Sequence, residues 1–526
     1  MKLFLLILVG FLFSSGVYFY FFFKKNDRGN KVILNPKKEV KLKNFILPYL
    51  EDSTFIFSLN YSLDSLDTTS QIYFYQKYSD SSNILCFRGN AQRSRSSIGK
   101  LTSSPKKIQI KWKFKTDIDP TRTHLGVWGG GTGWTGQPLF VHWKSGSNWR
   151  KNLRSSFYDR KELKEVIVGS LCGKVYFLEL ENGIETRNPI SINNPIKGTI
   201  SIDPRLNGNF YIGQGIEHTE KFGNYFYNLF TGDLLKYNSG NDQFSYRYWG
   251  AFDSNPLIDE KNQILFWPAE NGIIYRYDLQ KLNKEPIKFR YTKLNKSHQG
   301  IESSFGAYRN LGYFSDNNGN VFCLNLKTMK PVWYFDNLDD SDASMVVDII
   351  KDKPFLYIGN EVDKQGLRGK SFFRKIDGLS GKEIWNIERT CSSSSGGSNA
   401  NNGGILATCL VGKGKARDLI ITVFSRLNND NGGEIVAVNK ETGKEIYSIK
   451  LNSYSWSSPV DVYDKEGNMY FIHGDVSGNL NLYDGETGLV IDSIVLEGAI
   501  ESTPIAVDNT LIIGTRGGYI YNITIK

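Results

Sequence analysis

Cysteine is scarce in this chain of 526 residues, which has five: Cys86, Cys172, Cys323, Cys391 and Cys409. The number is odd and no CxxC pair occurs, which argues against a disulfide framework and against a thiolate zinc site. Cys323 and Cys409 lie in expected strands, where a single thiol behaves as a small apolar side chain. One pairing stays open if the domain is exported, between Cys391 and Cys409 across a glycine- and serine-rich stretch.

The sequence also lacks the motifs of several enzyme classes. Its five histidines are isolated, no HExxH occurs, and neither GxSxG nor a Walker loop stands before an expected helix. The formal net charge is +10, but the lysines are scattered and no basic helix or long basic cluster appears. We therefore expect no nucleic-acid binding.

Short β-rich runs and glycine turns are what the sequence has in abundance, with 51 glycines and 14% aromatic residues. Residues 469–474 and 480–484 read as two strands around a turn at Gly478, which can take a positive φ at no steric cost. A third strand follows the turn at 485–488. The same cycle then begins again, and the chain ends before its last strand.

This cycle recurs upstream, and its innermost strand opens with small residues eight times. A repeat of this kind is typical of a propeller, in which each sheet covers the edge of its neighbour. Residues 108–116 (IQIKWKFKT) alternate apolar and basic side chains and can supply the missing outer strand of the last unit. The sequence thus predicts an all-β, eight-bladed β-propeller of four-stranded blades, closed by an N-terminal strand.

Three turn-plus-aromatic stretches, TGKEIYSI, SGKEIWNI and KTMKPVWYF, resemble the tryptophan-docking repeat of the pyrroloquinoline quinone (PQQ) binding-like propellers. The stretch CFRGNAQRSR at 86–95, followed by WKF, is similar to the lead-in of that family. The resemblance covers residues 81–526 and implies an eight-bladed ring, as in quinoprotein alcohol dehydrogenases and in the outer-membrane β-barrel assembly lipoprotein. It does not decide activity, because the superfamily contains both dehydrogenases and proteins without catalysis.

Residues 3–23 are uncharged and apolar, and Lys24, Lys25 and Arg28 follow them. About 20 apolar residues can span a bilayer, so we expect a single-pass membrane anchor over 1–25, with a cleaved signal segment as the alternative. Residues 26–80 are expected to be a linker or a small N-terminal segment. The positive charge after the helix favours a cytoplasmic propeller, whereas the family resemblance implies export to the periplasm or cell surface, which we adopt.

Loops that join the second and third strands of a blade share one face of a propeller with the loops between blades, so function is expected there. Acidic residues concentrate on these predicted loops, together with one arginine, and three tryptophans, Trp134, Trp249 and Trp456, lie on or beside them. Carboxylates beside aromatic planes can bind a cation, a sugar or a basic peptide, although acids in such turns also commonly accept hydrogen bonds from backbone amides. The candidate ligand-binding residues are Trp134, Glu217, Asp253, Glu270, Glu302, Asp316, Asp342, Glu361, Asp475, Glu501 and Arg516.

The function that we predict is a non-catalytic, membrane-anchored binding or assembly scaffold in the cell envelope, with protein partners at the acidic mouth. One alternative is a PQQ-dependent dehydrogenase with calcium, and a second is a glycan-binding module. The dehydrogenases of the family carry two adjacent cysteines beside the cofactor, and this sequence has none. We therefore predict no cofactor, no metal ligand and no catalytic residue.

Overall fold

The structure is a computed structural model that describes residues 45–60, 72–74, 78, 82–123, 126–133, 136–144, 148–294, 298–393, 402–427 and 431–526. The chain divides into two compact units, Met1–Asn44 and Phe45–Lys526, and the first lies outside the described residues together with the expected membrane span at 3–23. In the part that is described, no helix is long and apolar enough to cross a membrane.

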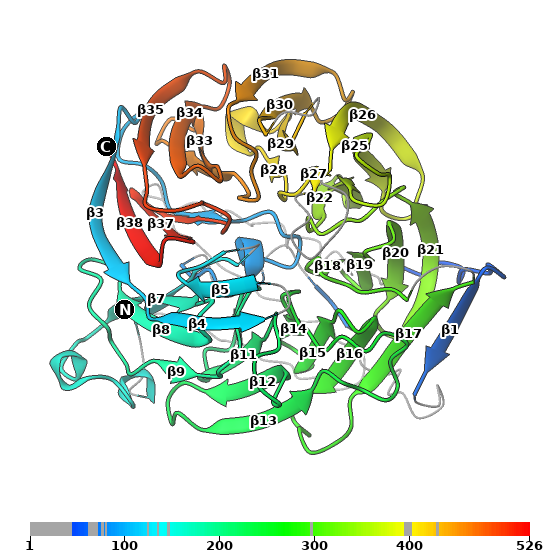
Figure 1. Cartoon of the computed structure of the whole chain (residues 1–526), viewed down its shortest axis with the longest axis horizontal. Coiled ribbons are helices and arrows are strands. Elements are labelled where there is room, and N and C mark those ends of the chain that lie inside the picture. The colour runs from blue at the N-terminus through cyan, green and yellow to red at the C-terminus, as the bar shows by residue number, and fades with distance from the viewer. Residues whose placement is uncertain are drawn as a thin grey trace, which may run out of the picture. The chain divides into compact units, whose positions relative to one another are not determined.

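Eight β-sheets of at least four strands stand around a common centre in the second unit (Figure 1). Blades one and two consist of β6 (Leu139–Trp143), β7 (Leu163–Gly169), β8 (Lys174–Glu179) and β9 (Ile190–Ser191), then β10 (Ser201–Ile202), β11 (Asn209–Gly213), β12 (Gly223–Asn228) and β13 (Leu234–Ser239). Blades three and four consist of β14 (Leu257–Asp259), β15 (Ile264–Pro268), β16 (Ile273–Asp278) and β17 (Ile287–Lys293), then β18 (Gly306–Tyr308), β19 (Leu311–Ser315), β20 (Asn320–Asn325) and β21 (Lys330–Asp336).

The second half of the ring repeats this order. Blades five and six consist of β22 (Val346–Ile350), β23 (Lys353–Gly359), β25 (Arg368–Asp377) and β26 (Glu383–Ser392), then β28 (Leu410–Val411), β29 (Leu419–Ser425), β30 (Gly433–Asn439) and β31 (Glu445–Leu451), with β24 (Glu361–Val362) and β27 (Gly403–Gly404) added. Blades seven and eight consist of β32 (Val460–Tyr463), β33 (Met469–Gly474), β34 (Asn479–Asp484) and β35 (Val490–Val495), then β36 (Ile505–Val507), β37 (Thr510–Thr515), β38 (Tyr519–Ile525) and β3 (Ile108–Lys115), with β2 (Ser97–Ile98) added. The predicted all-β, eight-bladed propeller is confirmed.

The ring closes as the sequence predicts. Strand β3, from near the start of the propeller, pairs antiparallel with β38 at the C-terminus, with Trp112 opposite Asn522 and Lys115 opposite Tyr519. In blade eight, β36, β37 and β38 take the first three positions and β3 takes the fourth. An early segment therefore fastens the last blade (Figure 1).

Aromatic side chains on outer strands join neighbouring blades through one repeated contact. The indole nitrogens of Trp112, Trp333 and Trp385 each donate to a backbone carbonyl in the next blade, at 3.0 to 3.2 Å. A glycine with positive φ lies under each of these rings, and a Cβ added to it would come within 2.8 Å of the ring. Tyr447 contacts blade seven in the same way. This is the docking geometry that the family resemblance implied.

The five cysteines are free and buried. The possible disulfide between Cys391 and Cys409 is therefore wrong. Cys391 sits at the end of β26 and Cys409 just before β28, each packed among apolar side chains of one core cluster. Burial raises the pKa of Cys86 to about 11 and that of Cys391 to about 12, which keeps both as thiols.

Residues 45–60 pack on the propeller. Strand β1 (Phe55–Leu59) pairs antiparallel with β17 along its whole length and adds a fifth strand to blade three. The Phe55 ring lies 5.2 Å from Phe322 and 4.8 Å from Tyr334, which belong to blade four. Part of the region expected to be a linker thus covers the outer edge of one blade and contacts the next.

Residues 82–98, which we name the central segment, run along the inner strands of the ring. Backbone or side-chain hydrogen bonds join this segment to all eight blades, from Phe140 in blade one to Ala506 in blade eight. Its Arg88 and Arg93 are fully buried. Both guanidinium groups donate mainly to backbone carbonyls, at 2.8 to 3.3 Å, including those of Cys409 and Phe305.

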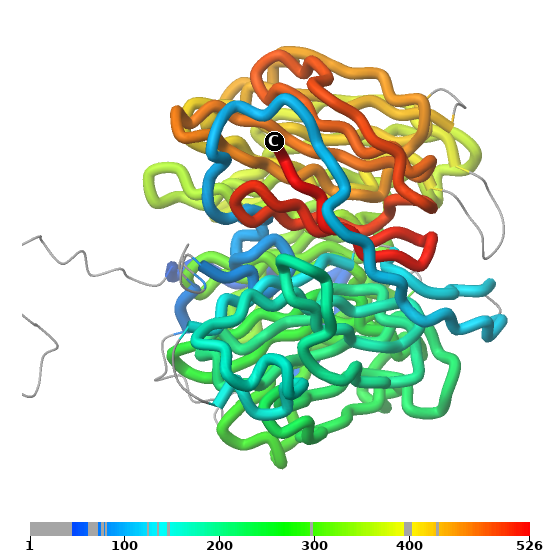
Figure 2. The backbone as a smooth tube through the Cα atoms, turned by 90° about the vertical axis from the view of Figure 1, so that its left-hand side faces the viewer, coloured from blue at the N-terminus to red at the C-terminus, as the bar shows by residue number. Residues whose placement is uncertain are grey.

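Two strands leave the ring between β3 and the first blade. Strands β4 (Ile118–Thr123) and β5 (Gly126–Gly130) form a separate antiparallel ribbon, which extends from one face of the propeller in the side view (Figure 2). Nδ1 of His218 in blade two donates a hydrogen bond to Oδ2 of Asp119 at 2.9 Å and so ties the ribbon to the loop after β11. The ribbon therefore stands over the face that carries the candidate site.

Candidate functional site

The loops between second and third strands and the connections between blades lie at the same end of the antiparallel strands, which we name the mouth. Ten of the eleven predicted residues lie there, and Trp134 lies outside the described residues. Glu217, Glu270, Asp316, Glu361, Asp475 and Arg516 follow second strands, whereas Asp253, Glu302, Asp342 and Glu501 lie on connections between blades.

Two of the predicted acids hold their own turns. Asp316 accepts hydrogen bonds from the backbone nitrogens of Asn318 and Asn320, both at 2.9 Å, and from the Tyr291 hydroxyl at 2.7 Å. Asp475 likewise accepts from its turn, at 3.0 Å from the backbone nitrogen of Asn479 and 2.8 Å from its amide nitrogen. Both carboxylates therefore stabilise their own turns, and local donors already occupy their oxygens.

Arg516 and Glu501 meet on the opposite side of the mouth. Their side chains form an ion pair, with 3.9 Å between Nε of Arg516 and Oε2 of Glu501. The Arg516 guanidinium lies 5.2 Å from the ring of Trp128 on β5, and the Lys197 ammonium lies 5.6 Å from the same ring. The ribbon thus places one indole between two cations. Glu217 is exposed and stands apart from them.

Three predicted acids converge in the mouth. Carboxylate oxygens of Asp253, Glu270 and Glu302 lie within 4.8 Å of one another. Asp253 and Glu270 are buried, whereas Glu302 is half-buried. Lys197, on the connection before blade two, forms an ion pair with Asp253.

Four further acids from blades four and five extend this group. Asp340, Asp342 and Glu361 are buried, Asp363 is half-buried, and Glu302 raises the pKa of each of the four through charge repulsion. We name the seven side chains the carboxyl cluster: Asp253, Glu270, Glu302, Asp340, Asp342, Glu361 and Asp363. Glu302 is its common neighbour.

Burial and mutual repulsion hold protons on this cluster. Burial is the main reason that the pKa values of Glu270, Asp342 and Glu361 lie well above the usual range of a carboxyl, and neighbouring carboxylates raise them further. Burial also raises the pKa of Asp340 to about 8. For Lys197, burial favours the neutral amine, but Asp253, Glu270 and Glu302 outweigh it and raise its pKa. The cluster stabilises positive charge.

Several acceptors in the cluster have no hydrogen-bond donor. In the part of the chain that the structure describes, Oδ1 of Asp253, Oε1 of Glu270 and Oε1 of Glu361 are buried without a hydrogen-bond partner. A buried unpaired acceptor costs about 1–3 kcal/mol. A ligand that brings N–H donors and a positive charge would satisfy these oxygens.

Calcium with a quinone fits this group poorly. Clustered carboxylates are the ligands that calcium prefers, but the Lys197 ammonium already lies against Asp253. The adjacent cysteine pair of the quinoprotein dehydrogenases is absent from the sequence. The residues at the mouth therefore match a site for an organic cation better than a quinone and metal site.

Sequence reasoning missed four groups that shape the site: Lys197, Trp128, Asp340 and Asp363. Asp340 belongs to the acidic run DDSD at 339–342, and of this run only Asp342 is predicted from the sequence as a candidate ligand-binding residue. Lys197 and Trp128 gave no local signal, because their partners lie 56 and 388 residues further along the chain, at Asp253 and Arg516.

Similarity to known proteins is found among solved structures, at low sequence identity. No protein-family model matches the sequence, and no curated protein matches it. Similar solved structures include the computationally designed protein Ika8, at 12% identity over 78% of this chain and 100% of that chain, with a TM-score of 0.48. BamB from Moraxella catarrhalis is similar at 15% identity over 73% and 98%, with a TM-score of 0.47. A europium-containing methanol dehydrogenase is similar at 11% over 85% and 98%, with a TM-score of 0.43.

Proposed function

We propose that this protein is a non-catalytic binding scaffold of the cell envelope, anchored in the membrane through residues 3–23, whose mouth receives a lysine or arginine side chain of a protein partner. One observation carries this proposal. The carboxyl cluster has seven acids, whereas the cations that act on them are Lys197, Arg247 and Lys364. The mouth therefore keeps an excess of carboxyl groups, some of whose oxygens lack donors. An entering cation would lower their raised pKa values and displace the protons that burial holds on them.

The burial of the cluster limits what can reach it. Most of its members are less than a tenth exposed, so a broad protein surface cannot lie against them. Glu302 is half-buried and offers the approach. A single long side chain with a cationic end suits this geometry, because its stem can remain among apolar atoms while its head meets the carboxylates. Trp128 beside the cluster supplies a ring face for the same cation.

Replacing Glu302 by glutamine should weaken the binding of a capped peptide with one lysine about tenfold, which is about 1.4 kcal/mol. Glutamine keeps the size of the side chain and removes the negative charge that all members of the cluster share. Isothermal titration at low salt measures the affinity, since screening weakens half-buried ion pairs.

Glu217→Gln is the matched control for this experiment. It removes the same charge from an exposed position on the same face, outside the cluster, and should leave the affinity unchanged. Equal losses of peptide affinity in the two variants would show that binding depends on the overall negative charge of the mouth and not on the position of Glu302. If the wild-type protein binds neither a lysine nor an arginine peptide, the proposed ligand is wrong.

The carboxyl cluster should also make stability depend on pH. Folding raises the pKa values of Glu270, Asp340, Asp342 and Glu361, so these groups in their protonated form stabilise the protein fully below about pH 4, where unfolded carboxyls are protonated as well. That contribution is lost as the pH rises through about 8, the pKa of Asp340. Melting temperatures between pH 5 and 9 should fall less steeply in Glu302→Gln than in the wild type. Parallel curves would contradict this assignment.

The proposed location is tested by protease access. A protease added to spheroplasts should cut the propeller, while a cytoplasmic control protein stays intact. Protection of the propeller until the membrane is broken would place it on the other side. Carbonate extraction would separate an anchored chain, which stays with the membrane, from one whose first residues are removed.

A further inference from the structure

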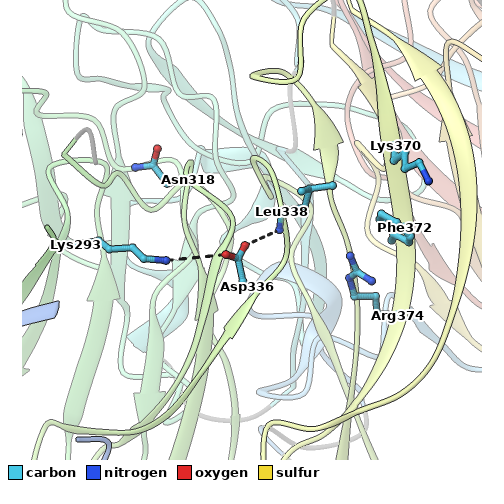
Figure 3. A pocket seen from close by; sticks show the side chains of 7 residues that line it. All are labelled: Lys293, Asn318, Asp336, Leu338, Lys370, Phe372 and Arg374. Atoms are coloured by element: carbon cyan, nitrogen blue, oxygen red, sulfur yellow. Dashed lines mark hydrogen bonds and ion pairs between the residues drawn. The ribbon is translucent and has the colours of Figure 1, made fainter. Parts of the chain in front are cut away.

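A second site, lined by none of the seven acids of the carboxyl cluster, lies between blades three, four and five. It is a pocket of about 540 Å³. Its lining residues come from β17, from the loop after β19, from the end of β21 and from β25: Lys293, Asn318, Asp336, Leu338, Lys370, Phe372 and Arg374 (Figure 3). That volume is in the range of sites that bind small organic molecules.

The charge of this pocket is opposite to that of the carboxyl cluster. Three cations, Lys293, Lys370 and Arg374, line it with one carboxylate, Asp336. Lys370, Phe372 and Arg374 alternate along β25, so the pleat directs all three side chains to the same side (Figure 3). The strand thus presents two positive charges with an aromatic ring between them.

Arg374 is held ready to bind. Its Nε donates to Asn337 at 2.9 Å and its Nη1 to Glu383 at 2.8 Å, while its guanidinium lies 4.1 Å from the centre of the Phe372 ring. Among the residues that the structure describes, Nη2 has no acceptor. A side chain fixed in advance loses little entropy when it binds an anion, and the guanidinium plane suits carboxylate and phosphate oxygens.

Neither lysine of the pocket forms an ion pair that is both close and buried. Lys370 lies 3.0 Å from Glu388, but the side chains are 60% and 40% exposed, so solvent screens this pair. Lys293 donates to the Tyr334 hydroxyl at 2.6 Å and lies 4.0 Å from Asp336. A ligand anion can therefore compete for both ammonium groups.

We propose that this pocket binds a small organic anion, with a phosphate or carboxylate group between the cations and an apolar or aromatic body against Phe372 and Leu338. Leu338 is 50% exposed at the lip of the pocket, and Asn318 adds an amide on the opposite wall. The inference does not depend on the function proposed for the mouth.

Phenyl phosphate and benzoate are the probes, titrated at low salt into the full chain, with inorganic phosphate as the head group alone. We expect phenyl phosphate or benzoate to bind several-fold more tightly than inorganic phosphate. Lys370→Gln should weaken the binding about fivefold, because one of three cations is lost. Asp336→Asn should strengthen it about threefold, because it removes the one carboxylate of the lining and keeps the oxygen that accepts from the Leu338 amide.

Lys382→Gln is the matched control. Lys382 is an exposed lysine on the turn between β25 and β26 of blade five, and it does not line the pocket. The relative affinities of phenyl phosphate and benzoate show whether the pocket prefers a phosphate or a carboxylate group. If neither organic probe binds, or if the variants at 370 and 336 fail to move the affinity in opposite directions relative to the control, the proposal is overturned. Equal affinity for phenyl phosphate and inorganic phosphate would overturn the apolar part of the site.

Discussion

Replacing Arg93 by methionine is expected to lower the free energy of unfolding by about 4 kcal/mol or more, because buried acceptors that lose a charged donor cost about 1–3 kcal/mol each. Arg93 donates to the carbonyls of Phe305, Phe87 and Asn255 and to the amide oxygen of Asn255, at 2.8 to 2.9 Å. The guanidinium is fully buried, so water cannot replace it. Urea denaturation of the wild type and the variant measures the difference.

Arg95→Met is the control for this prediction. Arg95 belongs to the same central segment but is half-buried, and its bond to the Asn83 carbonyl is long, at 3.4 Å. We expect a loss below about 1 kcal/mol, as for most substitutions outside the core. Similar losses in the two variants would mean that the central segment contributes by its backbone rather than through the buried guanidinium of Arg93.

The Arg93 prediction bears on how the ring holds its shape. Asn255 belongs to blade three, Phe305 to blade four and Phe87 to the central segment. One side chain thus joins two blades to the centre. Arg88 does the same for blades six and seven, through the carbonyls of Cys409 and Pro459. We infer that the central segment fixes the positions of the inner strands, and hence of the mouth loops that follow from them.

Trp333→Ala should cost about 3–4 kcal/mol, the range measured when a large buried aromatic side chain is truncated. Trp333 is 6% exposed, its ring covers Gly381 of blade five, and its indole nitrogen donates to the Gly378 carbonyl at 3.0 Å. Alanine removes both the packing and the hydrogen bond. The melting temperature and the urea midpoint report the loss.

Trp333→Phe separates the two contributions. Phenylalanine keeps most of the packing on Gly381 and loses the hydrogen bond to blade five, so we expect a loss of about 1–2 kcal/mol. The converse change, Gly381→Ala, places a methyl group 2.7 Å from Cδ2 of Trp333 at a φ of +71°, and should also destabilise the protein. If Trp333→Ala and Trp333→Phe cost the same, ring packing contributes little to the joint between the blades.

Local pattern was enough to predict the blades. Strand length, alternation and glycine turns are properties of neighbouring residues, and the eight openings gave the number of sheets. The unpaired strand at the C-terminus and the alternation of residues 108–116 then predicted the closure, because a sheet edge without its partner is unfavourable. The positions of β3, Trp112 and the docking glycines are all readable from the sequence.

The site was predicted less completely. Repeat position identifies which loops share a face, so the sequence predicts that Asp253, Glu270 and Glu302 lie on that face. The same reasoning gave Asp316 and Asp475 equal weight, although their oxygens are used by turn amides at 2.9 to 3.1 Å. The pairing of Lys197 with Asp253 lay beyond any local rule.

The sequence by itself determined the number of blades, the order of their strands and the end at which acidic loops gather, since these depend on short periods and turn residues. Tertiary structure alone decided which acids from different blades come together in the carboxyl cluster and which acids accept hydrogen bonds from their own turns. It also decided that a basic pocket opens beside β25. The physical reason is distance along the chain: carboxyl repulsion, burial and ion pairing act between side chains that only the closed ring brings within a few ångströms.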